Sequence, residues 1–275
     1  MAAEHLVIVG KSGVGRSTTA ANLSAALAEA GKRVVLIGYD SHWSSTGTLR
    51  GSNVLRALPA WAPGEDAPLY AQGFRGSLCI EAGESAAARD AAGAKLLAHP
   101  LVVEFDPEYV VHDTTSEPGG AFSPPHVGEG VARLVAVTSA DKGALQAVNH
   151  LFAWINTVAA ANCRFGGVVM NNLSGPLYEA IVSDFASQTG TSIAASVPRS
   201  IMVSVSDFYS QTLLESAPFS HVSYAYRKLA KTLLEGKEQR RPRSLDADTL
   251  KLWSQKWGDI ISELETGVIT GGLGI

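Results

Sequence analysis

The segment GKSGVGRST at residues 10–18 constrains the fold more than any other part of the chain. An apolar run, HLVIV at 5–9, precedes this segment, and a helix-forming run, STTAANLSAALAEA at 17–30, overlaps its end. A second apolar run, RVVLIG at 33–38, follows the helix. Two such runs separated by a helix are typical of parallel strands joined by a right-handed crossover. The sequence therefore predicts an α/β protein that opens strand–loop–helix–strand.

The rest of the chain continues this alternation. We expect strands at 77–81, 109–113, 134–138, 167–171 and 192–197, and helices near 85–98, 142–158, 177–190, 201–215, 221–235 and 246–264. Residues 41–75 are rich in Ser, Gly, Pro and Ala without periodicity, so we expect a long loop with one helical turn near Val54–Leu58. The pattern predicts a predominantly parallel sheet with helices on both faces.

Composition narrows the class of protein. The 275 residues are 46% hydrophobic and 17% charged with a net charge of −4, which indicates a globular chain and argues against nucleic-acid binding. No run approaches the ~18 apolar residues of a membrane span. The first residues lack the basic and apolar regions of a signal peptide. Two cysteines argue against a disulfide framework, so the expected location is the cytoplasm.

The glycines of the segment 10–18 predict what it binds. Gly10, Gly13 and Gly15 let the backbone take positive φ and approach an anion closely. Successive N–H groups then point inward, and the positive end of the following helix adds to them. Ser17 stands where a hydroxyl ligates Mg²⁺. We therefore expect this phosphate loop to bind ATP or ADP through Gly10, Lys11, Ser12, Gly13, Val14, Gly15, Arg16, Ser17 and Thr18.

Arg16 departs from the usual phosphate-loop sequence, which has lysine at this position. Arginine keeps the positive charge and binds phosphate, even with two N–H groups. Its guanidinium is planar and bulky, however, whereas lysine acts as a compact point charge. We expect nucleotide binding to be retained and the hydrolysis of ATP to ADP and phosphate to be slow.

Two aspartates fall at the carboxyl ends of expected strands, namely Asp40 and Asp113. Ligands bind at that edge in open α/β sheets. Carboxylates at this edge hold Mg²⁺ directly or through water. We therefore place Asp113, together with Ser17, at the expected metal site.

Lys11, directly after the first glycine of the loop, marks the deviant P-loop group, also called deviant Walker A, whose members dimerise across two nucleotides. Within that group the chain resembles the nitrogenase iron protein and its relative in dark protochlorophyllide reduction. The similar segments are GKSGVGRSTTAANLSAALAEAGKRVVLIGYD, FRGSLCIEAGE, and SVPRSIMVSVSDFYSQTLLE followed by YRKLA. The resemblance covers nearly the whole chain.

The resemblance implies roles for several residues. Lys11 would reach the nucleotide of the partner subunit in a homodimer, and Asp40 matches the aspartate that positions the attacking water, so both are expected to be catalytic. Asp113 matches the aspartate of the second switch, near Mg²⁺. Asn171 matches an asparagine that contacts the base, and Pro198–Arg199 lie where the family lines the adenine pocket.

The resemblance also implies where a partner protein docks. The segment SHWSSTG after Asp40 stands where the first switch lies, and Ser44 or Ser45 takes the magnesium-sensing role there. We expect partner contacts near 41–50, where Trp43 suits either a partner contact or packing, and near 114–130.

Neither of the two positions where the family has cysteine ligands of a [4Fe–4S] cluster carries a cysteine in this chain. In the family each subunit of the dimer gives two cysteines to one cluster, since thiolates are the ligands such clusters use. The first position falls near Ala91 in SAAARDAAGAK and the second at Pro118 in DTTSEPGGAF. We interpret Cys79 and Cys163 as packing residues, so no cluster is expected.

Three hypotheses for function remain open. The first is a cluster-free ATP-dependent homodimeric switch that acts on a partner protein as an assembly, maturation or regulatory factor. The second is a positioning ATPase like ParA or MinD, and the third is an electron-transfer protein with a relocated cluster.

In each, residues 1–236 form the nucleotide-binding domain, and 237–275 form a linker and a helix that packs on this domain or the dimer mate. A basic cluster in that linker is expected to be solvated; it comprises Lys237, Arg240, Arg241 and Arg243.

Overall fold

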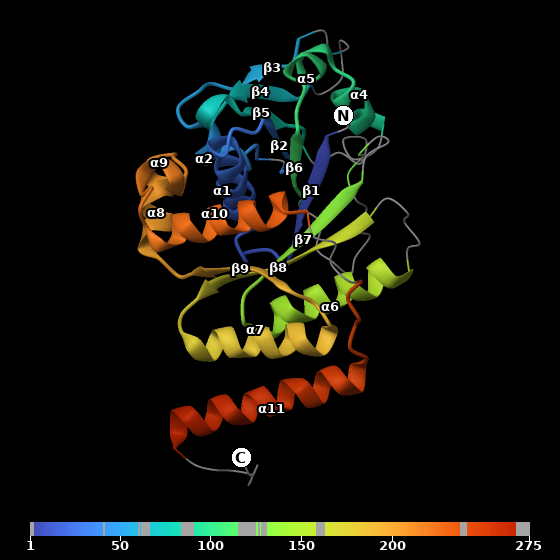
Figure 1. Cartoon of the computed structure of the whole chain (residues 1–275), viewed down its shortest axis with the longest axis vertical. Coiled ribbons are helices and arrows are strands. Elements are labelled where there is room, and N and C mark those ends of the chain that lie inside the picture. Colours follow the sequence, from blue (N-terminus) through green and yellow to red (C-terminus); the bar gives the residue numbers. More distant parts are fainter. Residues whose placement is uncertain are drawn as a thin grey trace.

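The structure is a computed structural model that describes residues 3–40, 42–59, 61, 67–83, 91–114, 125, 127, 131–157, 163–236 and 241–267. Its strands are β1 (Glu4–Val9), β2 (Val34–Gly38), β3 (Arg56–Ala57), β4 (Leu69–Gln72), β5 (Leu78–Glu81), β6 (Tyr109–Asp113), β7 (Ala132–Thr138), β8 (Cys163–Leu173) and β9 (Ile193–Pro198). They form one sheet in the order β3-β4-β5-β2-β6-β1-β7-β8-β9 (Figure 1). The sheet is parallel from β5 to β9, and β3 and β4 add an antiparallel edge.

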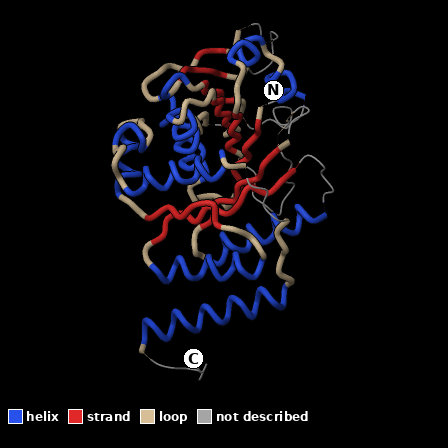
Figure 2. Tube along the Cα trace, viewed as in Figure 1, coloured by secondary structure: helices blue, strands red, loops and turns tan. Residues whose placement is uncertain are grey.

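Helices cover both faces of the sheet (Figure 2). They are α1 (Arg16–Glu29), α2 (Gly47–Arg50), α4 (Ala91–Leu97), α5 (Pro100–Phe105), α6 (Lys142–Thr157), α7 (Pro176–Thr189), α8 (Ile201–Phe208), α9 (Leu213–Ser216), α10 (His221–Leu234) and α11 (Ala247–Thr266), with the 3₁₀ turn η1 (Phe74–Gly76). One apolar core joins α1 and α10 to the sheet, and a second joins α6 and α7 to the opposite face. The predicted α/β fold, predominantly parallel with helices on both faces, is confirmed.

Small side chains explain why α1 lies between two layers. Ten consecutive residues of this helix, 19–28, are buried, and most are Ala, Ser or Thr. A helix that is buried all round needs such small residues where backbones approach closely. The β1–loop–α1 unit is therefore held rigidly from both sides, which fixes the phosphate loop at its end.

The prediction for residues 41–75 is wrong. The helical turn lies at Gly47–Arg50 rather than near Val54–Leu58, and β3, β4 and η1 follow it. The expected helix at 201–215 is two helices, because Ser210 takes a left-handed φ of 50° between them. Helix α5 was not predicted, and the first part of the helix expected at 85–98 falls outside the described residues.

The C-terminal helix α11 packs against α7 of its own chain (Figure 1). The indole N–H groups of Trp253 and Trp257 donate to the Asp184 carboxylate at 2.9 and 2.7 Å. The Asn149 side chain bonds both backbone groups of Leu245, at 2.9 and 2.7 Å. In the part of the chain that is described, no helix has both the length and the apolar character to cross a membrane.

Candidate functional site

The phosphate loop connects β1 to α1 at the carboxyl edge of the sheet. Gly13 and Gly15 have φ of 82° and 93°, which side chains with a Cβ rarely adopt. Gly10 has an ordinary φ, but a Cβ there would lie 2.4 Å from the Val137 carbonyl oxygen. At each of the three predicted positions a different physical reason therefore requires glycine, and together the three glycines let the backbone make a tight turn ahead of the helix.

Asp113, at the end of β6, is buried with 3% exposure beneath this loop. Its carboxylate accepts hydrogen bonds from the hydroxyls of Ser17 and Ser45. Burial raises the pKa of Asp113, while those two hydrogen bonds and the charge of Arg16 act in the opposite direction. The geometry thus brings together the two expected metal ligands, Ser17 and Asp113, as oxygen donors of the kind that Mg²⁺ prefers.

Asp40 follows β2 and lies at the mouth of the same site. Ser44 donates to its carboxylate through its hydroxyl and, at 3.3 Å, through its backbone N–H. The His42 ring nitrogen Nδ1 also lies 3.3 Å from Asp40 Oδ1. Burial raises the pKa of Asp40, but the hydrogen bonds from Ser44 and His42 outweigh it and hold this pKa below its ordinary value. Asp40 is therefore an ionised acceptor at neutral pH.

Lys11 lies at the surface of the loop. Its side chain is 45% exposed, and Nζ is 4.0 Å from Asp141 Oδ1 just before α6. An exposed pair of this kind contributes little to stability. The lysine is therefore free to exchange this contact for another.

The three residues expected at the base lie on the neighbouring strands. Asn171 Nδ2 donates to the Val14 carbonyl of the loop at 2.7 Å, and a Cβ on Gly15 would lie 2.3 Å from the same Nδ2. Pro198 ends β9, and the Arg199 N–H donates to the Leu173 carbonyl at 2.9 Å. The structure thus brings Asn171 onto the phosphate loop and puts Pro198–Arg199 at the end of the next strand.

Sequence reasoning assigned no individual role to three residues near the site, His42, Thr46 and Glu81, although it placed the first two in the first switch. Thr46 donates twice to Glu81, at the end of β5. The rule that found Asp40 and Asp113, a carboxylate at the carboxyl end of a strand, also applies to Glu81. His42 gave no comparable signal.

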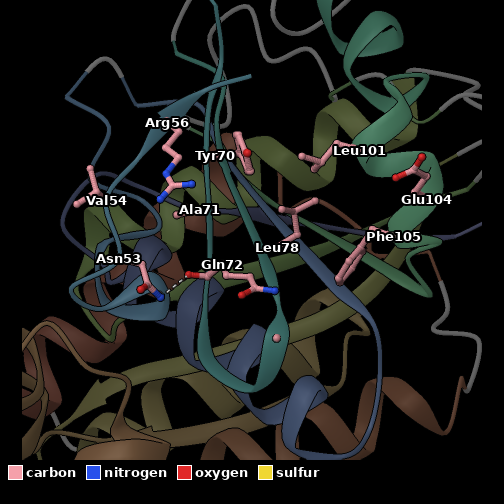
Figure 3. Close-up of a pocket in the computed structure, with 11 residues that line it drawn as sticks. Asn53, Val54, Arg56, Tyr70, Ala71, Gln72, Leu78, Leu101, Glu104 and Phe105 are labelled. Atoms are coloured by element: carbon pink, nitrogen blue, oxygen red, sulfur yellow. Dashed lines mark hydrogen bonds between the residues drawn. The ribbon is translucent and has the colours of Figure 1, made fainter. Parts of the chain in front are cut away.

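A cavity of about 490 Å³ lies away from this site, between the antiparallel edge and α5 (Figure 3). Its lining residues are Asn53, Val54, Arg56, Tyr70, Ala71, Gln72, Gly76, Leu78, Leu101, Glu104 and Phe105. None of these residues belongs to the phosphate loop or to the expected metal site. Among the residues described, no cluster of three or more His, Cys, Asp or Glu side chains is arranged to hold a metal ion.

A mostly parallel sheet with a glycine-rich phosphate loop between its first strand and first helix defines an α/β P-loop NTPase. The model of the 4Fe-4S iron sulfur cluster binding proteins, NifH/frxC family, matches residues 4–258, and the chain belongs to this family. Nitrogenase iron protein 2 of Paenibacillus durus is 34% identical over 97% of this chain and 96% of its own length. The nitrogenase iron protein of Methanospirillum hungatei JF-1 is 31% identical over 90% and 94%.

Solved structures show the same fold. The MinC:MinD cell division protein complex of Aquifex aeolicus matches with a TM-score of 0.63 at 18% identity, over 86% of this chain and 97% of that one. MinD of Pyrococcus horikoshii OT3, complexed with Mg-ADP, matches with a TM-score of 0.58 at 17% identity, over 86% and 98%. The predicted family and the P-loop NTPase fold are therefore confirmed.

Proposed function

We propose that this protein is an ATP-binding homodimeric switch that hydrolyses ATP slowly and acts on a partner protein without carrying an iron–sulfur cluster. One observation carries the proposal. The left-handed Gly13 and Gly15 form an anion cradle, and directly beside it the Ser17 hydroxyl lies on the buried Asp113 carboxylate. An anion site next to a hard-cation site is the arrangement that a magnesium nucleotide requires.

The residues of the site divide the work as follows. The backbone N–H groups of the loop and the guanidinium of Arg16 bind the phosphates. Ser17, and Asp113 directly or through water, would hold Mg²⁺, which would supply charge neutralisation at the phosphate oxygens. Asp40, ionised and oriented by Ser44, accepts a hydrogen bond from the attacking water. The Mg-ADP complex of the solved MinD supports the choice of nucleotide and cation.

The positions of the cysteines support a switch without a cluster. The chain has two cysteines, and neither stands at the positions near Ala91 and Pro118 that the family resemblance points to. Cys79 is fully buried in β5, and burial raises the pKa of its thiol, which disfavours the thiolate that iron requires. Cys163 begins β8, at the edge of the sheet opposite the phosphate loop.

A dimer and a partner protein complete the proposal. Lys11 is exposed beside the loop, where the family resemblance has it reach the partner's nucleotide. In the first switch, the Trp43 side chain is 47% exposed, which suits a protein contact near 41–50. The second expected docking segment, 114–130, lies mostly outside the described residues. One solved neighbour is a complex of MinD with MinC, so the fold is compatible with a partner protein.

The experiment is anaerobic purification with iron analysis, followed by light scattering with ADP, with a non-hydrolysable ATP analogue, and without nucleotide. We expect no iron beyond trace amounts and a doubling of molar mass, or a tightened dimer, with the analogue. About four irons per dimer would refute the cluster-free proposal. An unchanged monomer with the analogue would refute the dimeric switch.

A further inference from the structure

Three neighbouring strands end in register beside the phosphate loop. Glu81 of β5 is paired with Gly38 of β2, and Gly38 is paired with Asp113 of β6. Residues paired in this way share one face of the sheet. The two carboxylates therefore stand on the same face on either side of a residue that has no side chain.

The side chains of Ser45, in the first switch, and of Glu81 fill the space above Gly38, and Thr46 binds Glu81. The Thr46 backbone N–H and hydroxyl both donate to Glu81 Oε1, each at 2.7 Å. The Ser45 hydroxyl donates to Asp113. A Cβ on Gly38 would lie 2.3 Å from Glu81 Oε2 and 2.4 Å from Ser45 Cβ, so only glycine leaves room for this arrangement. Consecutive residues of the switch are thus held by two different buried carboxylates.

We propose that Glu81 is a positioning residue that fixes the first switch together with α2, residues 42–50, through Thr46, while the Ser45–Asp113 contact is the one that changes with the nucleotide. This inference rests on the proposed function, since Asp113 is there the carboxylate beside Mg²⁺. A cation at Ser17 and Asp113 competes with the Ser45 hydroxyl for the same carboxylate. Glu81 is hydrogen-bonded to Thr46 and does not contact the cation, so it keeps this contact when the Ser45–Asp113 contact changes. The switch then moves about Thr46 as its fixed point.

The burial of Glu81 indicates that this carboxylate has a role beyond packing. Glu81 is 1% exposed, and its Oε2 has no hydrogen-bond partner within the described part of the chain. Such burial is costly, and an apolar side chain of similar size would pack there more favourably. What the carboxylate adds is an acceptor for both donors of Thr46. Through Ser44, two residues earlier, the fixed Thr46 also sets the position of Asp40.

The test compares Glu81→Ala with Glu81→Gln, whose amide oxygen still accepts from Thr46. Thr189→Val is the control for general destabilisation. It removes from α7, far from the site, a hydroxyl that is as buried as that of Thr46. The first readout is hydrogen–deuterium exchange of the nucleotide-free protein. We expect Glu81→Ala to lose about tenfold or more of the protection at 42–50, the scale of a hydrogen bond to a carboxylate. Glu81→Gln and Thr189→Val keep it.

The second readout is the ratio of the affinities for Mg-ATP and Mg-ADP, which we expect to move toward one in Glu81→Ala and to stay near the wild-type ratio in Glu81→Gln. Unchanged protection in Glu81→Ala, or equal losses in Glu81→Gln and Glu81→Ala, would overturn the inference. If Glu81→Ala does not fold, Thr46→Val removes one of the two donors, and unchanged protection at 42–50 in that variant overturns it as well. A wild-type chain that binds no nucleotide refutes the proposed function, whereas the exchange experiment still decides the role of Glu81.

Discussion

Gly15→Ala is expected to destabilise the fold and to abolish nucleotide binding for one geometric reason. The left-handed φ of 93° costs an alanine about 1–2 kcal/mol. The new Cβ would also lie 2.3 Å from Asn171 Nδ2, so the hydrogen bond from Asn171 to the Val14 carbonyl must break, at about 1 kcal/mol. The total of about 2–3 kcal/mol corresponds to a fall in Tm of roughly 3–5 °C for a chain of this size.

Gly31→Ala provides the matched control. Gly31 has a similar φ of 81°, but a Cβ there meets nothing within 4 Å, and the residue follows α1 at the end away from the phosphate loop. This variant should show the backbone strain alone, about 1–2 kcal/mol, and should bind Mg-ATP like the wild type. The measurements are thermal unfolding and titration with a fluorescent ATP analogue. Equal losses of stability in the two variants, or wild-type affinity in Gly15→Ala, would show that the contact with Asn171 does not shape the loop.

Three further variants test other parts of the site and fold. Arg16→Lys should raise the rate of ATP hydrolysis, measured as phosphate release, and an equal or lower rate would show that arginine suits this site better. Asp113→Asn should raise Tm without nucleotide, because burial raises the pKa of this acid and its ionised form opposes folding, yet it should remove the Mg²⁺ dependence of nucleotide binding. Burial acts to raise the pKa of Asp184, but hydrogen bonds from Trp257 and Lys256 dominate and lower it. The ionised Asp184 therefore stabilises the fold above about pH 4, and this contribution is lost as the pH falls through the lowered pKa. In Asp184→Asn, the free energy of unfolding measured with urea should depend less on pH in that acid range. An unchanged dependence on pH would contradict the role of this carboxylate.

The phosphate loop could be predicted from the sequence because its signals are local. Strand, glycines and helix follow one another within 30 residues, and each glycine has a backbone reason that does not depend on distant residues, apart from the approach of Gly10 to Val137. Asp40 and Asp113 were found by the same reasoning, since any carboxylate at the end of a parallel strand reaches this edge.

The antiparallel edge could not be predicted, because its pairing is not local. Strand β3 has two residues, and β4 is held by its register with β5 rather than by any alternation of its own. The role of Glu81 required the same knowledge: only the register that aligns it with Gly38 and Asp113 brings it to Thr46. For Asn171, the sequence indicated a contact with the base, and the structure adds the bond to the Val14 carbonyl of the loop.

The most direct test of the proposed switch is the binding of Mg-ATP to the wild-type chain, measured by isothermal titration calorimetry with and without Mg²⁺. We expect one nucleotide per chain, weaker binding when Mg²⁺ is chelated, and a matching rise in Tm, because a ligand that binds the folded state stabilises it. The absence of both binding heat and a shift in Tm at millimolar Mg-ATP would contradict the proposal that this loop binds a nucleotide.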